Sequence, residues 1–233
     1  MGTRKRMEGV APDGDTGNSV TYKLIIFDFD GTLADSFPWF VEVSNALADR
    51  YRFKRMTEQE GATLRSLSAR QIIRHLGIPA WKLPFIARHA RVLAKRDRAQ
   101  IALFPSVDAM LAQLAAAGIT LAVVSSNSEE TVRHVLGPES AAHITYYVCG
   151  SSIFGKQAHF RRVLKQSDVR PAEALCIGDE IRDYEAASAV GMPFGAVAWG
   201  YTTAEALIAC APSKVFHQVE EIVVHLTKNE AEM

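Results

Sequence analysis

Short apolar runs alternate with helical stretches along most of this chain, and this alternation limits the fold more than any other feature. Six runs are expected to form strands: residues 24–27, 119–124, 144–148, 174–177, 194–198 and, more weakly, 214–216. Helices are expected at residues 106–117, 129–136 (ending at Gly137), 157–166, 181–190 and 204–210. Because parallel strands need crossovers that cover both faces of a sheet, the pattern predicts an α/β fold with a parallel sheet and helices on both faces.

One segment, residues 37–100, interrupts the alternation. It contains no convincing strand and is typical of several amphipathic helices, broken at Gly61, at residues 77–79 and at Pro84. We therefore expect an inserted all-α domain at 37–100, a sheet-containing core at 21–36 and 101–233, and a flexible tail at 1–20, where no apolar period is found. Four aromatic side chains are expected to fill the core of the insertion or its seam with the sheet: Trp39, Phe53, Trp81 and Phe85.

The charge of the chain is balanced overall but divided between its parts. The 233 residues hold 26 Lys and Arg against 26 Asp and Glu, which argues against a nucleic-acid partner. Residues 49–98 alone carry 13 Lys and Arg against four Asp and Glu, so this segment is +9 and the remainder is −9. Its arginines either coat helix surfaces or draw an anionic substrate toward an acidic site.

Other features favour a cytoplasmic protein without a membrane role. No apolar run approaches the roughly 20 residues of a membrane-spanning helix, and residues 1–20 lack the apolar region of a secretory signal. The three cysteines, Cys149, Cys176 and Cys210, are far apart in mostly apolar surroundings, which indicates reduced thiols. Both a monomer and a homodimer are compatible with the sequence.

Polar residues follow directly after several expected strands, where open α/β sheets bind their ligands. They are Asp28 and Asp30 after the first run, Ser125, Ser126 and Asn127 after the second, Lys156 near a third, and Asp179, Glu180 and Asp183 after a fourth. Ser125 is favoured over Ser126 as a functional hydroxyl because it directly follows its run. Glu180 is interpreted as an exposed charge at a helix start.

The carboxylates of this set predict a magnesium site. Asp28 and Asp30 lie two residues apart on an extended chain, so their side chains start on the same face, and Asp179 would join them from a neighbouring strand. Carboxylates this close repel one another unless a cation compensates them. Oxygen ligands without a histidine or cysteine cluster favour Mg²⁺ over zinc.

Four motifs in this order resemble those of the haloacid dehalogenase superfamily of phosphatases: DFDGT at 28–32, a serine at 125, a lysine at 156 and GDEIRD at 178–183. The resemblance covers residues 22 to about 199, and the helical insertion is similar to the C1 cap of that superfamily. The phrases LFPSV at 103–107 and VAWGY at 197–201 are similar to phosphoglycolate-phosphatase-like members. The resemblance implies a Rossmann-like core and hydrolysis of a small anionic phosphomonoester.

The resemblance also implies roles for single residues. Asp28 would be the nucleophile that forms an aspartyl-phosphate, and Asp30 would act first as acid and then as base. Mg²⁺ would be held by Asp28, the backbone carbonyl of Asp30 and Asp179. Asp183 would orient a metal-bound water or Lys156.

Further contacts to the phosphate and the substrate are implied in the same way. Ser125 and Lys156 would bind the phosphate, aided by the start of the following helix, where Asn127 and Glu130 are interpreted as a capping pair. The candidate substrate-binding residues are Gly31, Thr32, Ser126, Asn127, Arg65 and Arg70. The two arginines either bind a substrate carboxylate or are solvated helix residues.

Several alternatives stay open. The family's lysine is often followed by proline, whereas Gln157 follows Lys156 here, so Lys165 is a less favoured substitute. The acid at Asp30 argues against the dehalogenases and phosphonatases of the superfamily. Two other functions are a phosphomutase acting on sugar phosphates and a non-catalytic binding protein that uses the basic cap.

Overall fold

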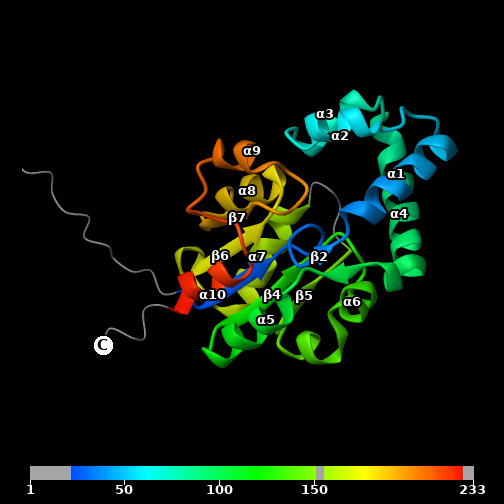
Figure 1. Cartoon of the computed structure of the whole chain (residues 1–233). Helices are drawn as coiled ribbons and strands as arrows, with labels where there is room; N and C mark the ends of the chain where they lie inside the picture. Colours follow the sequence, from blue (N-terminus) through cyan, green and yellow to red (C-terminus); the bar gives the residue numbers. More distant parts are fainter. Residues whose placement is uncertain (1–21, 151–154, 228–233) are drawn as a thin grey trace, which may run out of the picture.

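A computed structural model of the chain describes residues 22–150 and 155–227 (Figure 1). Its centre is a six-stranded sheet in the order β5-β4-β1-β6-β7-β8, in which every pair of neighbours is parallel. The strands are β1 (Leu24–Phe27), β4 (Thr120–Val124), β5 (Tyr146–Val148), β6 (Ala174–Gly178), β7 (Phe194–Val197) and β8 (Lys214–Phe216). The six expected strands are therefore confirmed, with ends that differ by at most two residues. The expected tail at 1–20 lies outside the described residues.

Helices cover both faces of this sheet (Figure 1). One face packs against α5 (Val107–Ala116), α6 (Glu129–Ala142) and α10 (Glu220–Thr227), and the other against α7 (Lys156–Ser167), α8 (Ile181–Ser188) and α9 (Ala204–Ile208). Strand β1 shows the reason, because Ile25 and Phe27 join one apolar core while Leu24 and Ile26 join the other. All four side chains are fully buried, so the run is apolar throughout. The predicted α/β class is confirmed.

Helix α6 is longer than the sequence pattern predicts. Gly137 does end the first helical segment, and its backbone is left-handed at φ 72°. Pro138 then begins a second segment that runs to Ala142, since proline suits the first turn of a helix. The structure also contains α10, which is not among the expected helices.

Residues 37–100 contain helical segments consistent with a cap on the sheet, and no strand. The elements of this cap are α1 (Phe37–Tyr51), α2 (Glu58–Leu64), α3 (Ala69–His75), α4 (Leu83–Asp97) and two short 3₁₀ turns at Ala80–Lys82 and Arg98–Gln100. Helices α1 and α4 lie side by side and project away from the sheet (Figure 1). Both connections to the core pass through a two-stranded antiparallel ladder of β2 (Ala34–Asp35) and β3 (Ala102–Leu103), which no hydrophobic pattern in the sequence predicts.

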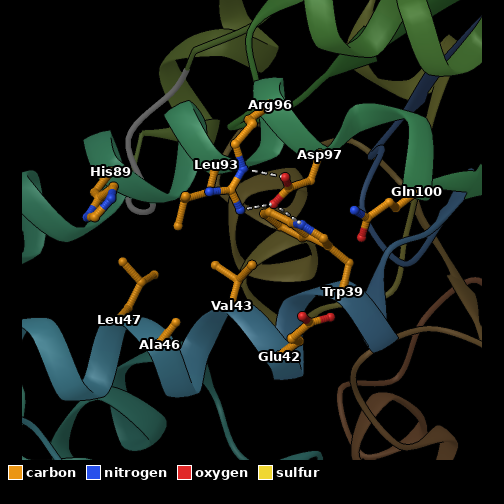
Figure 2. Close-up of a pocket in the computed structure, with 10 residues that line it drawn as sticks. All are labelled: Trp39, Glu42, Val43, Ala46, Leu47, His89, Leu93, Arg96, Asp97 and Gln100. Atoms are coloured by element: carbon orange, nitrogen blue, oxygen red, sulfur yellow. Dashed lines mark hydrogen bonds and ion pairs between the residues drawn. The ribbon is translucent and has the colours of Figure 1, made fainter.

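The cap buries few side chains, and its aromatic residues divide into two groups. Trp39 is partly buried and donates its indole N–H to Asp97, beside a pocket of about 220 Å³ between α1 and α4 (Figure 2). Phe53 is also partly buried, but Trp81 and Phe85 are 68% and 59% exposed. The expectation that all four rings fill the core of the insertion or its seam with the sheet is wrong for Trp81 and Phe85, because side chains this exposed lie in neither place. No helix in the described ranges is both long and apolar enough to cross a membrane.

Candidate active site

A buried ion pair lies at the carboxyl end of the central strand. Asp28 directly follows β1, and its Oδ1 accepts a hydrogen bond of 2.7 Å from the backbone N–H of Phe29. Its Oδ2 lies 2.7 Å from Nζ of Lys156, the first residue of α7, and the same ammonium group contacts Asp183. The alternative candidate Lys165 is exposed on α7. Lys156 is therefore the lysine that meets the carboxylates.

Burial and charge together shift the pKa values of these groups. Burial lowers the pKa of Lys156, but Asp183 and Asp28 outweigh this effect and hold the pKa above its usual value. Burial raises the pKa of Asp183 to about 7, against the opposing effect of Lys156. The pKa of Asp179 is raised well above its usual value by burial and by the neighbouring charges of Glu180 and Asp28. The carboxyl groups of this cluster therefore favour keeping a proton unless a further cation compensates their charge.

The residues present fit a hard divalent cation. Asp28, Asp179 and Asp183 each offer a carboxylate oxygen, and these atoms lie within 4.8 Å of one another. Each of these side chains is at most 4% exposed. A cluster of oxygen atoms without histidine or cysteine is the donor set that Mg²⁺ prefers.

Asp179 is oriented from two sides by short contacts. Its Oδ1 accepts a hydrogen bond of 2.7 Å from the hydroxyl group of Thr32, and its Oδ2 accepts one of 2.7 Å from the backbone N–H of Tyr201. A Cβ atom at Gly31 or at Gly200 would overlap Asp179, so this close approach requires both glycines. Thr32 and Gly31 are expected to contact the substrate. In the structure Thr32 donates a hydrogen bond to Asp179, and the absence of a side chain at Gly31 leaves room for the Asp179 carboxylate.

Asp30 is half-buried and accepts three hydrogen bonds. Ser36 donates at 2.9 Å, and the side-chain amide of Asn127 lies 3.1 and 2.8 Å from the two carboxylate oxygens. Burial and then the charge of Asp28 raise the pKa of Asp30 to about 6, while the hydrogen bond from Ser36 opposes the rise. Such a carboxyl group can both release and take up a proton near neutral pH.

The loop after β4 begins with two serines that differ in environment. Ser125 is fully buried, and its Oγ accepts a hydrogen bond of 3.0 Å from the backbone N–H of Asn127. Ser126 is half-buried. The loop therefore places Ser125 in the site beside Asn127.

The expected capping pair of Asn127 and Glu130 is wrong. The N-cap of α6 is Ser128, whose Oγ accepts from the backbone N–H of Thr131. Glu130 instead forms an ion pair of 2.6 Å with Lys95 of the cap helix α4. The helix begins one residue later than the pair requires, which leaves the Asn127 amide for Asp30.

The two cap arginines occupy different places. Arg65 follows α2 and donates from Nε to the carbonyl of Tyr201 at 3.1 Å and from Nη2 to the carbonyl of Gly200 at 2.7 Å. Its guanidinium group is thus hydrogen-bonded to the backbone of the segment after β7. Arg70 is exposed on α3.

Three residues at the site are not among the expected functional residues, namely Ser36, Tyr201 and Arg182, and Glu180 has a different place from the expected one. Ser36 shows no sequence signal, whereas Tyr201 belongs to the VAWGY phrase and the other two belong to GDEIRD. The interpretation of Glu180 as an exposed charge is wrong, since its side chain is 16% exposed and forms an ion pair with Arg182. Burial lowers the pKa of Arg182, but the charges of Glu180 and Asp183 outweigh this effect and raise the pKa above its usual value.

Comparison with known proteins gives the family. The pattern of the haloacid dehalogenase-like hydrolases matches residues 25–197, from the first strand to the last residue of β7. The chain belongs to this family. This hydrolase is 32% identical to phosphoglycolate phosphatase from Synechococcus elongatus over 213 residues, which cover 88% of this chain and 98% of the relative. The expectation of a phosphatase-like member of the family is thereby confirmed.

Solved structures support the same fold. A crystal structure described as a putative phosphoglycolate phosphatase from Lactobacillus plantarum superposes on the hydrolase with a TM-score of 0.75 at 23% identity, covering 88% of this chain and 99% of that one. A variant of CbbY from Rhodobacter sphaeroides in complex with xylulose-1,5-bisphosphate gives a TM-score of 0.68 at 23% identity, with coverages of 88% and 99%. The Rossmann-like core with its helical cap is therefore the fold of this family.

Proposed function

We propose that this hydrolase is a Mg²⁺-dependent phosphatase that releases phosphate from a small anionic phosphomonoester, similar to phosphoglycolate, through an aspartyl-phosphate. The observation that carries the proposal is the pair of carboxylates at the end of β1. Asp28 is buried and paired with Lys156, whereas Asp30 is hydrogen-bonded and has a pKa of about 6. Asp28, held beside the ammonium group of Lys156, is suited to act as the nucleophile, and Asp30 is suited to carry a proton.

The first step is transfer of the phosphoryl group to Asp28. A carboxylate oxygen of Asp28 attacks phosphorus, the bond from phosphorus to the ester oxygen breaks, and Asp30 gives its proton to the leaving oxygen. In the second step Asp30 takes a proton from water, whose oxygen attacks the same phosphorus. Phosphate is released and the Asp28 carboxylate is restored.

Residues around the pair are assigned to binding and orientation. Lys156 and Ser125 bind oxygens of the transferred group, and Asp183 holds the ammonium group of Lys156 in place. Asp28, the backbone carbonyl of Asp30 and Asp179 would hold Mg²⁺, with Asp183 beside them. The bound cation supplies shielding between the anionic phosphate and the nucleophile, and stabilises charge on the transferred oxygens.

The substrate class is inferred from the relatives. Synechococcus phosphoglycolate phosphatase, alike along 88% of this chain, supports a small phosphorylated acid. We also propose that residues 37–100 act as one domain that closes over the core of 21–36 and 101–233, and that Ser126 and Arg70 line the substrate space. A cytoplasmic location is supported by Cys149, Cys176 and Cys210, none of which forms a disulfide.

The test is phosphate release from a panel of phosphomonoesters, with and without Mg²⁺, using the wild-type protein and Asp28→Asn. We expect release that needs Mg²⁺ and is lost in the variant, while the circular dichroism spectrum is unchanged. Transfer between two sugar phosphates without free phosphate would overturn the proposal in favour of a mutase. No turnover of any ester by the folded protein with Mg²⁺ would favour a binding protein.

A further inference from the structure

We propose that Tyr201 is a positioning residue, latched by Arg65 of the cap, which couples the placement of the cap to the acid–base carboxylate of Asp30. The inference rests on the proposed function of Asp30 and concerns how that function is controlled. Neither Tyr201 nor Arg65 takes part in the two chemical steps proposed for Asp28 and Asp30.

The latch consists of three hydrogen bonds between one cap residue and the segment after β7. Arg65 donates to the carbonyls of Tyr201 and Gly200, at 3.1 and 2.7 Å, and its own carbonyl accepts a hydrogen bond of 2.9 Å from the backbone N–H of Thr203. Its guanidinium carbon also lies 5.2 Å from the centre of the Phe37 ring. Arg65 thus binds the core from one side and the first turn of α1 from the other.

Tyr201 contacts both the cap and the acidic cluster. Its ring lies 5.1 Å from the ring of Phe37 and 5.3 Å from that of Phe40, both on α1. Its backbone N–H donates to Asp179, and its hydroxyl oxygen lies 2.9 Å from Oγ of Ser36. Tyr201 therefore contacts α1 through its ring and the candidate active site through its backbone N–H and its hydroxyl group.

The hydrogen bonds between Tyr201 and Asp30 run in one direction. Ser36 is fully buried between β2 and α1, and its hydroxyl group donates to Asp30 at 2.9 Å. A serine hydroxyl has one hydrogen to donate, so while Asp30 is ionised and accepts that hydrogen, the bond between Ser36 and Tyr201 is donated by Tyr201. The hydrogen bonds from Tyr201 to Ser36 and from Ser36 to Asp30, with those from Asn127, hold the Asp30 side chain in one rotamer.

This arrangement predicts slower proton transfer from Asp30 when a hydrogen bond between Tyr201, Ser36 and Asp30 is removed. An alkyl phosphate releases a basic alkoxide that needs the proton of Asp30, whereas p-nitrophenyl phosphate releases a weakly basic phenolate that does not. A displaced Asp30 should therefore slow the first substrate far more than the second. A general loosening of the cap would slow both alike.

The experiment measures kcat and KM on an alkyl phosphate and on phenyl phosphates of graded leaving-group basicity, with Mg²⁺. We expect Tyr201→Phe to lower kcat about 10-fold or more on the alkyl ester, with KM nearly unchanged and with little effect on p-nitrophenyl phosphate. Arg65→Ala should show the same pattern, and Arg65→Lys should restore part of the rate. Tyr146→Phe and Arg161→Ala, which change a tyrosine and an exposed arginine away from the site, are the matched controls.

A second variant protects the test against a general loss of structure. Ser36→Ala removes the hydroxyl group that links Tyr201 to Asp30. The kcat of the double variant Ser36→Ala/Tyr201→Phe should therefore be no lower than that of Ser36→Ala alone. Additive losses, equal losses on all leaving groups, or wild-type rates in Tyr201→Phe would each overturn the positioning role while leaving the phosphatase intact. A wild-type protein that hydrolyses none of these esters would instead overturn the proposed function, and the positioning role with it.

Discussion

The side-chain amide of Asn127 lies within hydrogen-bond distance of both carboxylate oxygens of Asp30, at 3.1 and 2.8 Å. Asn127 is 6% exposed, so this contact is shielded from bulk water. The amide of Asn127 therefore contacts Asp30 and does not cap the following helix, whose N-cap is Ser128.

Asn127→Ala should therefore impair turnover more than binding. Loss of a hydrogen bond to a charged group costs about 1.5–3 kcal/mol, so we expect kcat to fall about 10- to 100-fold. Steady-state kinetics on the preferred ester are the measurement. A raised KM with an unchanged kcat would show that Asn127 binds substrate directly.

Lys156→Met should destabilise the fold as well as stop the reaction. The substitution leaves Asp28 and Asp183 buried without their cation, a situation that costs about 3–5 kcal/mol. Urea unfolding measures the loss, and Lys165→Met, which changes an exposed lysine, should stay within about 0.5 kcal/mol of wild type. The double variant Lys156→Met/Asp183→Asn should regain stability without regaining activity, whereas an equal loss in both would contradict the ion-pair explanation.

Gly31→Ala should abolish the response to Mg²⁺. Gly31 has φ +79°, and an added Cβ would overlap Oδ2 of Asp179. Gly77→Ala is the matched control, because Gly77 has φ +66° but open space around it, so only the left-handed backbone cost of about 1–2 kcal/mol applies. Thermal unfolding with and without Mg²⁺ should show stabilisation by the cation in the control and none in Gly31→Ala; stabilisation in both would argue against the cluster as the metal site.

The metal-free protein should lose stability as the pH rises from about 4 to 7. The pKa values of Asp30 and Asp183 are raised from 3.8 to about 6 and about 7, so over this interval the folded state binds more protons than the unfolded state. The stabilising effect is complete below the unfolded pKa and is lost as the pH passes the folded values. Urea unfolding in EDTA across this range checks the slope, which Asp30→Asn or Asp183→Asn should flatten. A rising stability would contradict the shifts.

The basic cap should raise the rate of substrate capture at low salt. Residues 49–98 carry a net charge of +9, and raising the ionic strength from 0.01 to 0.15 M shortens the Debye length from about 30 to about 8 Å. We expect kcat/KM to fall over this range and the fall to shrink when exposed arginines Arg52, Arg74 and Arg88 are changed to Gln. The same change at exposed Arg161 and Arg162 of α7 is the control. A flat salt profile would leave the cap charges without a steering role.

The hydrophobic pattern predicts the sheet because its central strands β1, β4, β6 and β7 bury apolar runs. Asp28 and Asp179 are predicted because they directly follow two of these runs, and Lys156 is predicted from its place in the order of the motifs. What the pattern missed depends on contacts between distant residues. Ser36 and Tyr201 are 165 positions apart, and nothing local to either indicates their hydrogen bond. The strands β2 and β3 have only two residues each, too few for any period to be visible.

The ladder of β2 and β3 determines how the insertion is joined to the sheet domain. It pairs Ala34 with Leu103 and Asp35 with Ala102, and paired antiparallel residues lie about 5 Å apart. The inserted segment therefore leaves and rejoins the sheet domain at nearly the same point. Because its two ends meet there, a change in the length or packing of the insertion need not disturb the strand order of the sheet or the carboxylates at the end of β1.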